Sequence, residues 1–402
     1  MLRILWTAFA LCVPLLAEVH WTRLSSATGD LPNPAGSHQQ TGILVARLDK
    51  SGAQSFVISY RVKAPALVWM RRTGSGWQRY VIENEFLPVE AGGAAFDIDS
   101  DGELDIVFGG DWQSNQLWWW ENPYPDYDPA KAWKRHVIKN SGANQHHDQI
   151  FADLKGTGIP QLAFWNQKAK TLFIANIPRE PKSEPWNYSV LYSGQAGEEV
   201  NDAARYAEGI DAFDIDGDGA PDLLAGNSWF HYRDNRFEPI TIGVIGGRIR
   251  AARFRRNNKT AQVVIAPGDG NGPLRIYEAT GDPAKPESWN GRNLLERDVI
   301  HCHTLDIGDI DGDGNLDIFT AEMAKWTDKP GVDNPGATAW ILYGDGKGNF
   351  RPTILSKGEG WHEGKLADVD GDGDLDIINK PYTWNAPRID IWLNQTTSTR
   401  KP

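Results

Sequence analysis

Short apolar runs bounded by glycine, proline and acidic residues recur along the whole chain. The second unit is the clearest, with runs at residues 92–98, 105–109, 117–121 and 133–138 that have the length and composition of β-strands. The fourth run of a unit has its own signature and begins with tryptophan at Trp77, Trp133 and Trp186. The pattern therefore predicts a repeated sheet of four strands.

A nine-residue motif, Asp-x-Asp-x-Asp-Gly-x-x-Asp, occurs four times between the first and second strands of a unit. Its aspartates are Asp97, Asp99, Asp101 and Asp105; Asp214, Asp216, Asp218 and Asp222; Asp309, Asp311, Asp313 and Asp317; and Asp368, Asp370, Asp372 and Asp376. Carboxylates at this spacing, with a carbonyl from position 7, form the oxygen-only cage that Ca²⁺ prefers. We therefore expect about four structural calcium ions. Position 12, which is glutamate in an EF-hand, is not acidic in any copy.

Three altered copies extend the set to seven. The loops begin at Arg47, Asp97, Asp153, Asp214, Arg253, Asp309 and Asp368. This blade-sized spacing predicts an all-β, seven-bladed β-propeller with four-stranded blades, formed as one domain by residues 18–402. The last unit lacks a fourth strand, and Trp21 to Leu24 have no unit of their own, so the N-terminal strand should join the last blade. Basic residues replace ligands in the altered copies, so we expect those three blades to be metal-free.

Residues 1–17 have the pattern of a signal peptide: a basic start at Arg3, an apolar run from Ile4 to Leu16 and small Ala17 at the expected cleavage point. The mature protein is therefore expected to be secreted or periplasmic. No second apolar segment is long enough to span a membrane, and no basic stripe suits nucleic acid. The formal net charge of −12 mainly reflects the aspartate-rich loops.

In four units, the residue six positions before the start of the loop has an ionisable side chain. These residues, which occupy the same position in the repeat, are His147, Glu208, His303 and His362. In a propeller this position begins the innermost strand, so these side chains should point toward a common axis. Imidazoles and a carboxylate can bind Zn²⁺ or Mn²⁺ and leave a position open for a substrate oxygen. A second imidazole, Tyr206 or Lys365 could then move a proton beside a carbonyl.

Two other interpretations of these side chains remain open. Histidine is a frequent polar filler of a wet channel, and blades on opposite sides of the ring could hold the four side chains too far apart to share an ion. A glycosidase pair could also form from Glu208, Glu322 and Glu363, because spacing in sequence does not determine their separation.

The loops after the second strands are predicted to lie on the same face as these histidines. We assign substrate binding to residues of this face, which combine aromatic rings with hydrogen-bonding groups: Trp112, Asn166, Arg248, Glu322, Trp326, Lys380 and Tyr382. Aromatic platforms interleaved with polar groups suit a sugar, whose C–H faces stack on rings and whose hydroxyls need partners. The expected ligand is a carbohydrate.

The aspartate loops, together with residues 343–350, resemble the FG-GAP and VCBS repeats of integrin-like seven-bladed propellers. This resemblance covers nearly all of the mature chain and implies the same fold. Such repeats occur in adhesion proteins, lectin-like modules and enzymes, so a protein partner is a second expectation.

A narrower resemblance is to the propeller of the aldos-2-ulose dehydratases, through residues 118–123 and the histidines preceding the loops at 303–314 and 362–373. It implies a catalytic zinc and dehydration of keto-sugars such as 1,5-anhydrofructose, with His147, His303 and His362 as metal ligands or acid/base groups. The chain differs by its signal peptide and by lacking the cupin domains. The sequence thus predicts a metal-dependent lyase acting on an oxidised sugar, or alternatively a non-catalytic propeller that binds carbohydrate or protein.

Overall fold

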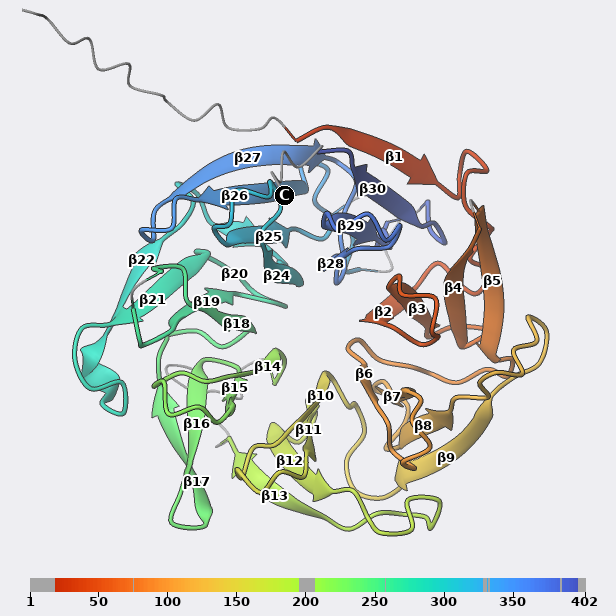
Figure 1. Ribbon diagram of the computed structural model, residues 1–402, viewed down its shortest axis with the longest axis horizontal. Helices are drawn as coiled ribbons and strands as arrows, with labels where there is room; N and C mark the ends of the chain where they lie inside the picture. Colours follow the sequence, from red (N-terminus) through yellow and green to blue (C-terminus); the bar gives the residue numbers. More distant parts are fainter. Residues whose placement is uncertain are drawn as a thin grey trace, which may run out of the picture.

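The protein is described by a computed structural model over residues 19–74, 76–194, 207–256, 258–327, 331, 333–383 and 385–396. Tyr206 and the predicted signal peptide lie outside these residues. Seven four-stranded antiparallel sheets form a ring around a central axis (Figure 1). The predicted all-β, seven-bladed propeller is therefore confirmed.

The first four blades follow the chain in order, with the innermost strand first. Blade 1 contains β2 (Gln40–Ala46), β3 (Ser55–Tyr60), β4 (Leu67–Thr73) and β5 (Gly76–Glu83). Blade 2 contains β6 (Ala94–Phe96), β7 (Asp105–Gly109), β8 (Leu117–Glu121) and β9 (Lys134–Lys139). Blade 3 contains β10 (Gln149–Ala152), β11 (Gln161–Asn166), β12 (Thr171–Asn176) and β13 (Tyr188–Ser193). Blade 4 contains β14 (Ile210–Phe213), β15 (Asp222–Ala225), β16 (Ser228–Arg233) and β17 (Arg236–Thr241).

The remaining blades keep this order, with one addition in blade 5. That blade contains β18 (Arg248–Ala252), β19 (Gln262–Ala266), β21 (Arg275–Ala279) and β22 (Trp289–Asn293), and a 3-10 turn at Pro286–Ser288 precedes β22. The added pair beside it is β20 (Asn271–Gly272) with β23 (Val299–Ile300). Blade 6 contains β24 (Thr304–Gly308), β25 (Asp317–Ala321), β26 (Thr338–Gly344) and β27 (Phe350–Lys357). Blade 7 contains β28 (Lys365–Ala367), β29 (Asp376–Asn379), β30 (Asp390–Asn394) and β1 (Trp21–Ser25).

The ring closes where β1 joins β30. Their antiparallel register runs from Trp21 opposite Asn394 to Ser25 opposite Asp390, which makes the N-terminal strand the outermost strand of blade 7. This confirms the predicted closure. It also pairs a strand from each end of the chain, so β1 covers the outward edge of β30.

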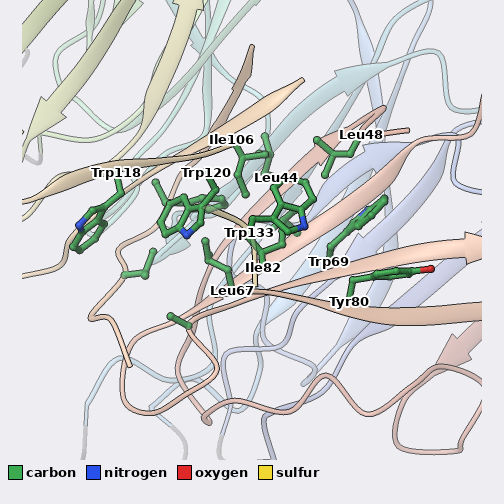
Figure 2. Close-up of a cluster of buried hydrophobic side chains, with 14 of the residues drawn as sticks. Leu44, Leu48, Leu67, Trp69, Tyr80, Ile82, Ile106, Trp118, Trp120 and Trp133 are labelled. Atoms are coloured by element: carbon green, nitrogen blue, oxygen red, sulfur yellow. The ribbon is translucent and has the colours of Figure 1, made fainter. Parts of the chain in front are cut away.

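The hydrophobic core is divided into seven clusters, each shared by two neighbouring blades of the described structure. Figure 2 shows the cluster between blades 1 and 2, in which Trp69, Trp120 and Trp133 are buried together. The ring centroids of Trp69 and Trp133 lie 6.0 Å apart in an edge-to-face arrangement, which aromatic pairs favour. Packing between blades is therefore the role of these tryptophans.

Replacing Trp120 with alanine should destabilise the propeller strongly. Its side chain is fully buried, and Nε1 donates a hydrogen bond to Glu83 Oε2 over 3.3 Å. We expect a loss of about 3–5 kcal/mol in the free energy of unfolding, measured by urea denaturation. Trp112→Ala is the matched control, because the Trp112 side chain is 58% exposed and its loss should change stability little. Equal losses in the two variants would contradict this account of the core.

The described residues contain no candidate for a membrane-spanning helix. None of their helical segments has the length and apolar character needed to cross a bilayer.

Candidate metal centre in the channel

The four ionisable residues at the predicted phase all lie just before the innermost strands of their blades. His147 precedes β10, Glu208 precedes β14, His303 precedes β24 and His362 precedes β28. A left-handed residue turns the backbone near each one: Asp148 (φ 49°), Ala207 (φ 50°), His301 (φ 43°) and Glu363 (φ 57°). Such conformations cost energy in non-glycine residues, and they are found where a site requires them.

Glycine is required beside Glu208 for a steric reason. Gly209 has φ 77°, and a Cβ there would lie 1.9 Å from Gly247 O. The loop after β19 also approaches closely, because a Cβ at Gly268 would lie 1.9 Å from Glu208 Oε1. These two glycines let blades 4 and 5 meet at the carboxylate.

Three of the four side chains converge. One ligand atom each from His147, Glu208 and His303 lies within 4.8 Å of the others, and all three residues are buried. Glu208 Oε2 lies 4.0 Å from His147 Nε2 and 3.5 Å from His303 Nδ1. Neither Glu208 Oε2 nor His303 Nδ1 has a hydrogen-bond partner among the described residues. Buried polar atoms are normally paired, so these two facing atoms fit a bound cation.

Carboxylates orient both histidines from behind. His147 Nδ1 lies 2.7 Å from Asp148 Oδ2, and His303 Nε2 lies 2.8 Å from Asp269 Oδ1. The second oxygen of Glu208, Oε1, accepts a 2.6 Å hydrogen bond from Asp269 N. Metal-binding histidines in proteins usually have such carboxylate partners, which fix the ring orientation and the tautomer.

The charges around this group alter its pKa values. Burial lowers the pKa of His147, but Asp148 outweighs that effect and raises it to about 10. Burial raises the pKa of Glu208, an effect that His303 opposes. A metal bound here would therefore have to displace a proton from His147, which makes affinity depend on pH.

Arg248 lies beneath the three residues and joins two acids. Its Nη1 lies 2.6 Å from Asp148 Oδ2, and its Nη2 lies 2.9 Å from Glu363 Oε1. All three side chains are buried. Arg248, predicted to bind substrate, therefore forms an internal ion-pair network that holds Asp148 against His147.

His362 lies beside the group rather than in it. Its ring stacks on His303 with centroids 4.6 Å apart, and its Nδ1 accepts a 2.8 Å hydrogen bond from Lys380 Nζ. Lys380 also donates to Gln40 O and Thr41 O. Burial lowers the pKa of Lys380 to about 7, while burial and the lysine charge hold the pKa of His362 well below its usual value. His362 is therefore held as a neutral imidazole beside Lys380.

The predicted substrate-binding residues separate into two sets. Trp112, Trp326 and Tyr382 line one cleft on the histidine-bearing face. Asn166 is fully buried and donates to Ala143 O. Glu322 is also buried, and its carboxylate pairs with Arg297 and accepts a hydrogen bond from Thr338 N. Asn166 and Glu322 therefore use their polar atoms within the protein, away from that cleft.

Sequence reasoning missed Asp269, which orients His303. It follows the second strand of blade 5, the same place in the repeat from which Trp112, Asn166 and Glu322 were selected. The signal for Asp269 is therefore its position after the second strand of blade 5, which matches the positions of those residues in the other blades. Lys365, a predicted proton carrier, instead lines a separate cavity further along the innermost strands, together with Arg250 and Asp306.

The four aspartate loops also cluster their carboxylates. The groups that come within 4.8 Å are Asp97, Asp99 and Asp101; Asp214, Asp216 and Asp218; Asp309, Asp311 and Asp317; and Asp368, Asp370 and Asp376. The position 9 aspartate has an additional structural role, since Asp105 accepts hydrogen bonds from Ile98 N and Asn122 N. Burial raises the pKa of Asp105 to about 7. Three buried loop oxygens, on Asp99, Asp309 and Asp370, have no partner in the described structure.

Two of the altered loops show how their side chains contact the surrounding backbone. Arg253 Nε donates to Lys259 O, the carbonyl at position 7 of its own loop, and Nη2 pairs with Asp214 of the neighbouring blade. In blade 3, Asp153 instead accepts hydrogen bonds from Thr157 N and Gly158 N, so this loop closes by itself. The intact blade 2 loop has the same type of backbone contact, since Asp97 accepts hydrogen bonds from Asp101 N and Gly102 N.

Comparison with known proteins supports the fold more strongly than any activity. A crystal structure of BBS1N in complex with ARL6DN is similar over 94% of this chain and 97% of that chain, with a TM-score of 0.53 and 9% identity. The rhamnogalacturonan lyase YesW matches 93% of this chain and 75% of its own, at 13% identity and a TM-score of 0.46, which is too distant to inform function. No curated protein matches the sequence. Residues 309–378 match the FG-GAP-like repeat family, so the chain is a seven-bladed β-propeller that contains an FG-GAP-like repeat.

Proposed function

We propose that this protein is a metal-dependent carbon–oxygen lyase that acts on a keto-sugar in the mouth of its channel. The observation that carries the proposal is the convergence of His147, Glu208 and His303 with two buried, facing ligand atoms that have no partner. Clustered ionisable groups of this kind mark functional sites more often than structural ones.

The donor set fits Zn²⁺ or Mn²⁺. Two imidazole nitrogens and one carboxylate oxygen are ligands that both ions accept, and catalytic zinc sites keep a further position for substrate. The side chain of Asp269 is 46% exposed, so the side of the site that this residue forms borders solvent. A metal bound there would polarise a carbonyl oxygen and so acidify the neighbouring C–H bond.

The protein's own side chains would carry the protons. An elimination removes a proton from the carbon beside the carbonyl, breaks a C–O bond and protonates the departing oxygen. His362 is placed to take part in one of these proton transfers, because its ring stacks on His303 and Lys380 Nζ lies 2.8 Å from its Nδ1. We assign the other proton transfer to Tyr206, which lies two residues before Glu208 in the sequence.

We assign a structural Ca²⁺ to each of the four intact aspartate loops. The support is the gathering of three carboxylates in each loop and the unpaired buried oxygens of Asp99, Asp309 and Asp370. Without a cation, carboxylates this close repel one another.

The proposed location is outside the cytoplasm, either secreted or periplasmic. Support comes from the basic start, apolar run and Ala17 of residues 1–17. Glycans and calcium are both abundant in such compartments, which agrees with the other parts of the proposal.

Elemental analysis of the purified mature protein after dialysis tests the channel site. We expect about one zinc or manganese per chain, in addition to calcium, and its loss from a His147→Ala/His303→Ala double variant. The same variant should keep its calcium, because the four loops lie at the other ends of the innermost strands. Calcium alone in both proteins would overturn the metal-dependent lyase.

That second outcome would favour a non-catalytic propeller that binds carbohydrate or protein on the same face. The supporting observation is an exposed apolar surface there. Four of the eight large apolar side chains exposed among the described residues, Val62, Phe86, Trp112 and Trp326, line a single cleft.

A further inference from the structure

The cleft beside the channel mouth has features that the proposed reaction does not use. Its volume is about 350 Å³ and its lining comes from blades 1, 2, 6 and 7. The lining residues are Gln39, Arg61, Val62, Phe86, Trp112, Gln113, Lys325, Trp326, Thr327 and Tyr382. His147, Glu208, His303 and His362 are not among them. A ligand group bound in the cleft would therefore be separate from the part of the substrate that binds the proposed metal.

Stacked rings nevertheless connect the cleft to the proposed metal site. Tyr382 lies against His362 with ring centroids 5.0 Å apart, and His362 stacks on His303. Tyr382, which lines the cleft, is therefore in direct contact with a residue that packs against the proposed metal site.

The surface of the cleft suits a sugar ring. Trp112 is 58% exposed and Trp326 is 37% exposed, so both present ring surface to a ligand. Trp326 is held in place by a stack on His301, with centroids 4.2 Å apart and planes 9° from parallel. Gln113 and Thr327 supply hydrogen-bonding groups between the rings. Rigid aromatic platforms with a few polar groups are typical of carbohydrate sites.

Arg61 lies at the base of the cleft and is already neutralised. It pairs with Glu90 and lies 3.4 Å from Asp111 Oδ2, and both acids are buried. A charged ligand would therefore gain little from this guanidinium, because two carboxylates already surround it. Stacking and hydrogen bonding therefore add to whatever Lys325, the other cation lining the cleft, contributes.

From these features we infer that the substrate is the end of a glycan chain, in which the keto unit lies at the metal and the next sugar stacks in this cleft. The inference rests on the proposed lyase function. It extends the proposed substrate from a free keto-sugar to a keto-sugar at the end of a glycan chain. Binding energy from the second sugar would orient the reacting unit, as contacts remote from the chemistry commonly do.

The test compares kcat/KM for a free 2-keto-glucose with that for cellotriose and maltotriose carrying the same keto unit at one end. We expect the wild type to prefer at least one trisaccharide by tenfold or more. Trp112→Ala should reduce that preference several-fold, and Trp112→Phe should restore most of it because the ring is retained. Ile159→Ala is the matched control, since Ile159 is 62% exposed but lies outside the cleft. It should leave the preference unchanged.

Equal kcat/KM for free and chain-borne units in the wild type would overturn the inference while leaving the lyase intact. If no keto-sugar is turned over, the lyase fails, and calorimetric titration with unmodified cellotriose and maltotriose still tests the cleft. Binding of either trisaccharide that Trp112→Ala weakens, and Ile159→Ala does not, would support a glycan-binding cleft. Absence of such binding would exclude it.

Discussion

Replacing His303 with alanine is expected to remove the channel metal and abolish turnover of a keto-sugar with little loss of stability. His303 provides one of three ligand atoms and packs against His362, so the variant leaves His147 and Glu208 without their partner. We expect kcat/KM to fall by roughly a thousandfold or more, about 4 kcal/mol of transition-state stabilisation. The free energy of unfolding should change by less than about 2 kcal/mol, because the seven inter-blade clusters are untouched.

Two further variants make this prediction sharper. Asp269→Asn keeps the ligand but weakens the contact that orients it, so activity and metal affinity should fall by about 10–100-fold. His20→Ala removes an exposed histidine far along the chain from the site and should change neither property. A His303→Ala protein that kept its metal, or that lost stability in proportion to activity, would identify His303 as a structural residue.

The repeat could be predicted from sequence because it is local. Each aspartate loop contains its own ligands within nine residues, and its glycine and flanking apolar runs define the strands on either side. The closure by β1 was also predictable, since residues 21–24 carried the fourth-strand pattern without a unit. These features depend on nearest neighbours in the chain.

The channel site depends on geometry that the sequence does not contain. Equal phase selected His147, Glu208 and His303, which the structure brings together, but the sequence did not give the distance across the ring. The innermost strands bring these residues within 4.8 Å even though they belong to blades 3, 4 and 6. By contrast, His362 has the same phase, yet its Nδ1 contacts Lys380 Nζ and it is not one of the three converging residues.

The roles of charged residues were the hardest to predict. Arg248 and Glu322 occupy positions that suit substrate binding, but Arg248 forms buried ion pairs and the buried Glu322 carboxylate pairs with the partly exposed Arg297. A buried charge needs a partner, and that partner can come from any part of the fold. Glu363, for example, lies 115 residues from Arg248 along the chain and still pairs with it.

Chelation of calcium should lower the thermal unfolding midpoint by more than about 10 °C. An ion that binds only the folded state stabilises it by about 2.7 kcal/mol when its concentration is a hundredfold above Kd, and four loops are expected to contribute. Removing the ions also leaves three mutually repelling carboxylates in each loop. Differential scanning calorimetry with excess chelator, and then with Ca²⁺ or Mg²⁺ restored, measures the effect. Calcium should restore the midpoint, whereas magnesium should not, because the smaller ion requires a stricter octahedral site.

Single-loop variants assign the calcium effect to particular blades. Asp309→Ala removes a ligand from blade 6 and should reduce the calcium-dependent part of the midpoint shift by roughly a quarter, if the four loops act independently. Asp153→Ala is the matched control, because Asp153 begins the blade 3 loop and is satisfied by Thr157 N and Gly158 N. It should lower stability equally with and without calcium. A midpoint that does not respond to chelation would show that the carboxylate clusters are stable without an ion, and the structural role assigned to calcium would then be wrong.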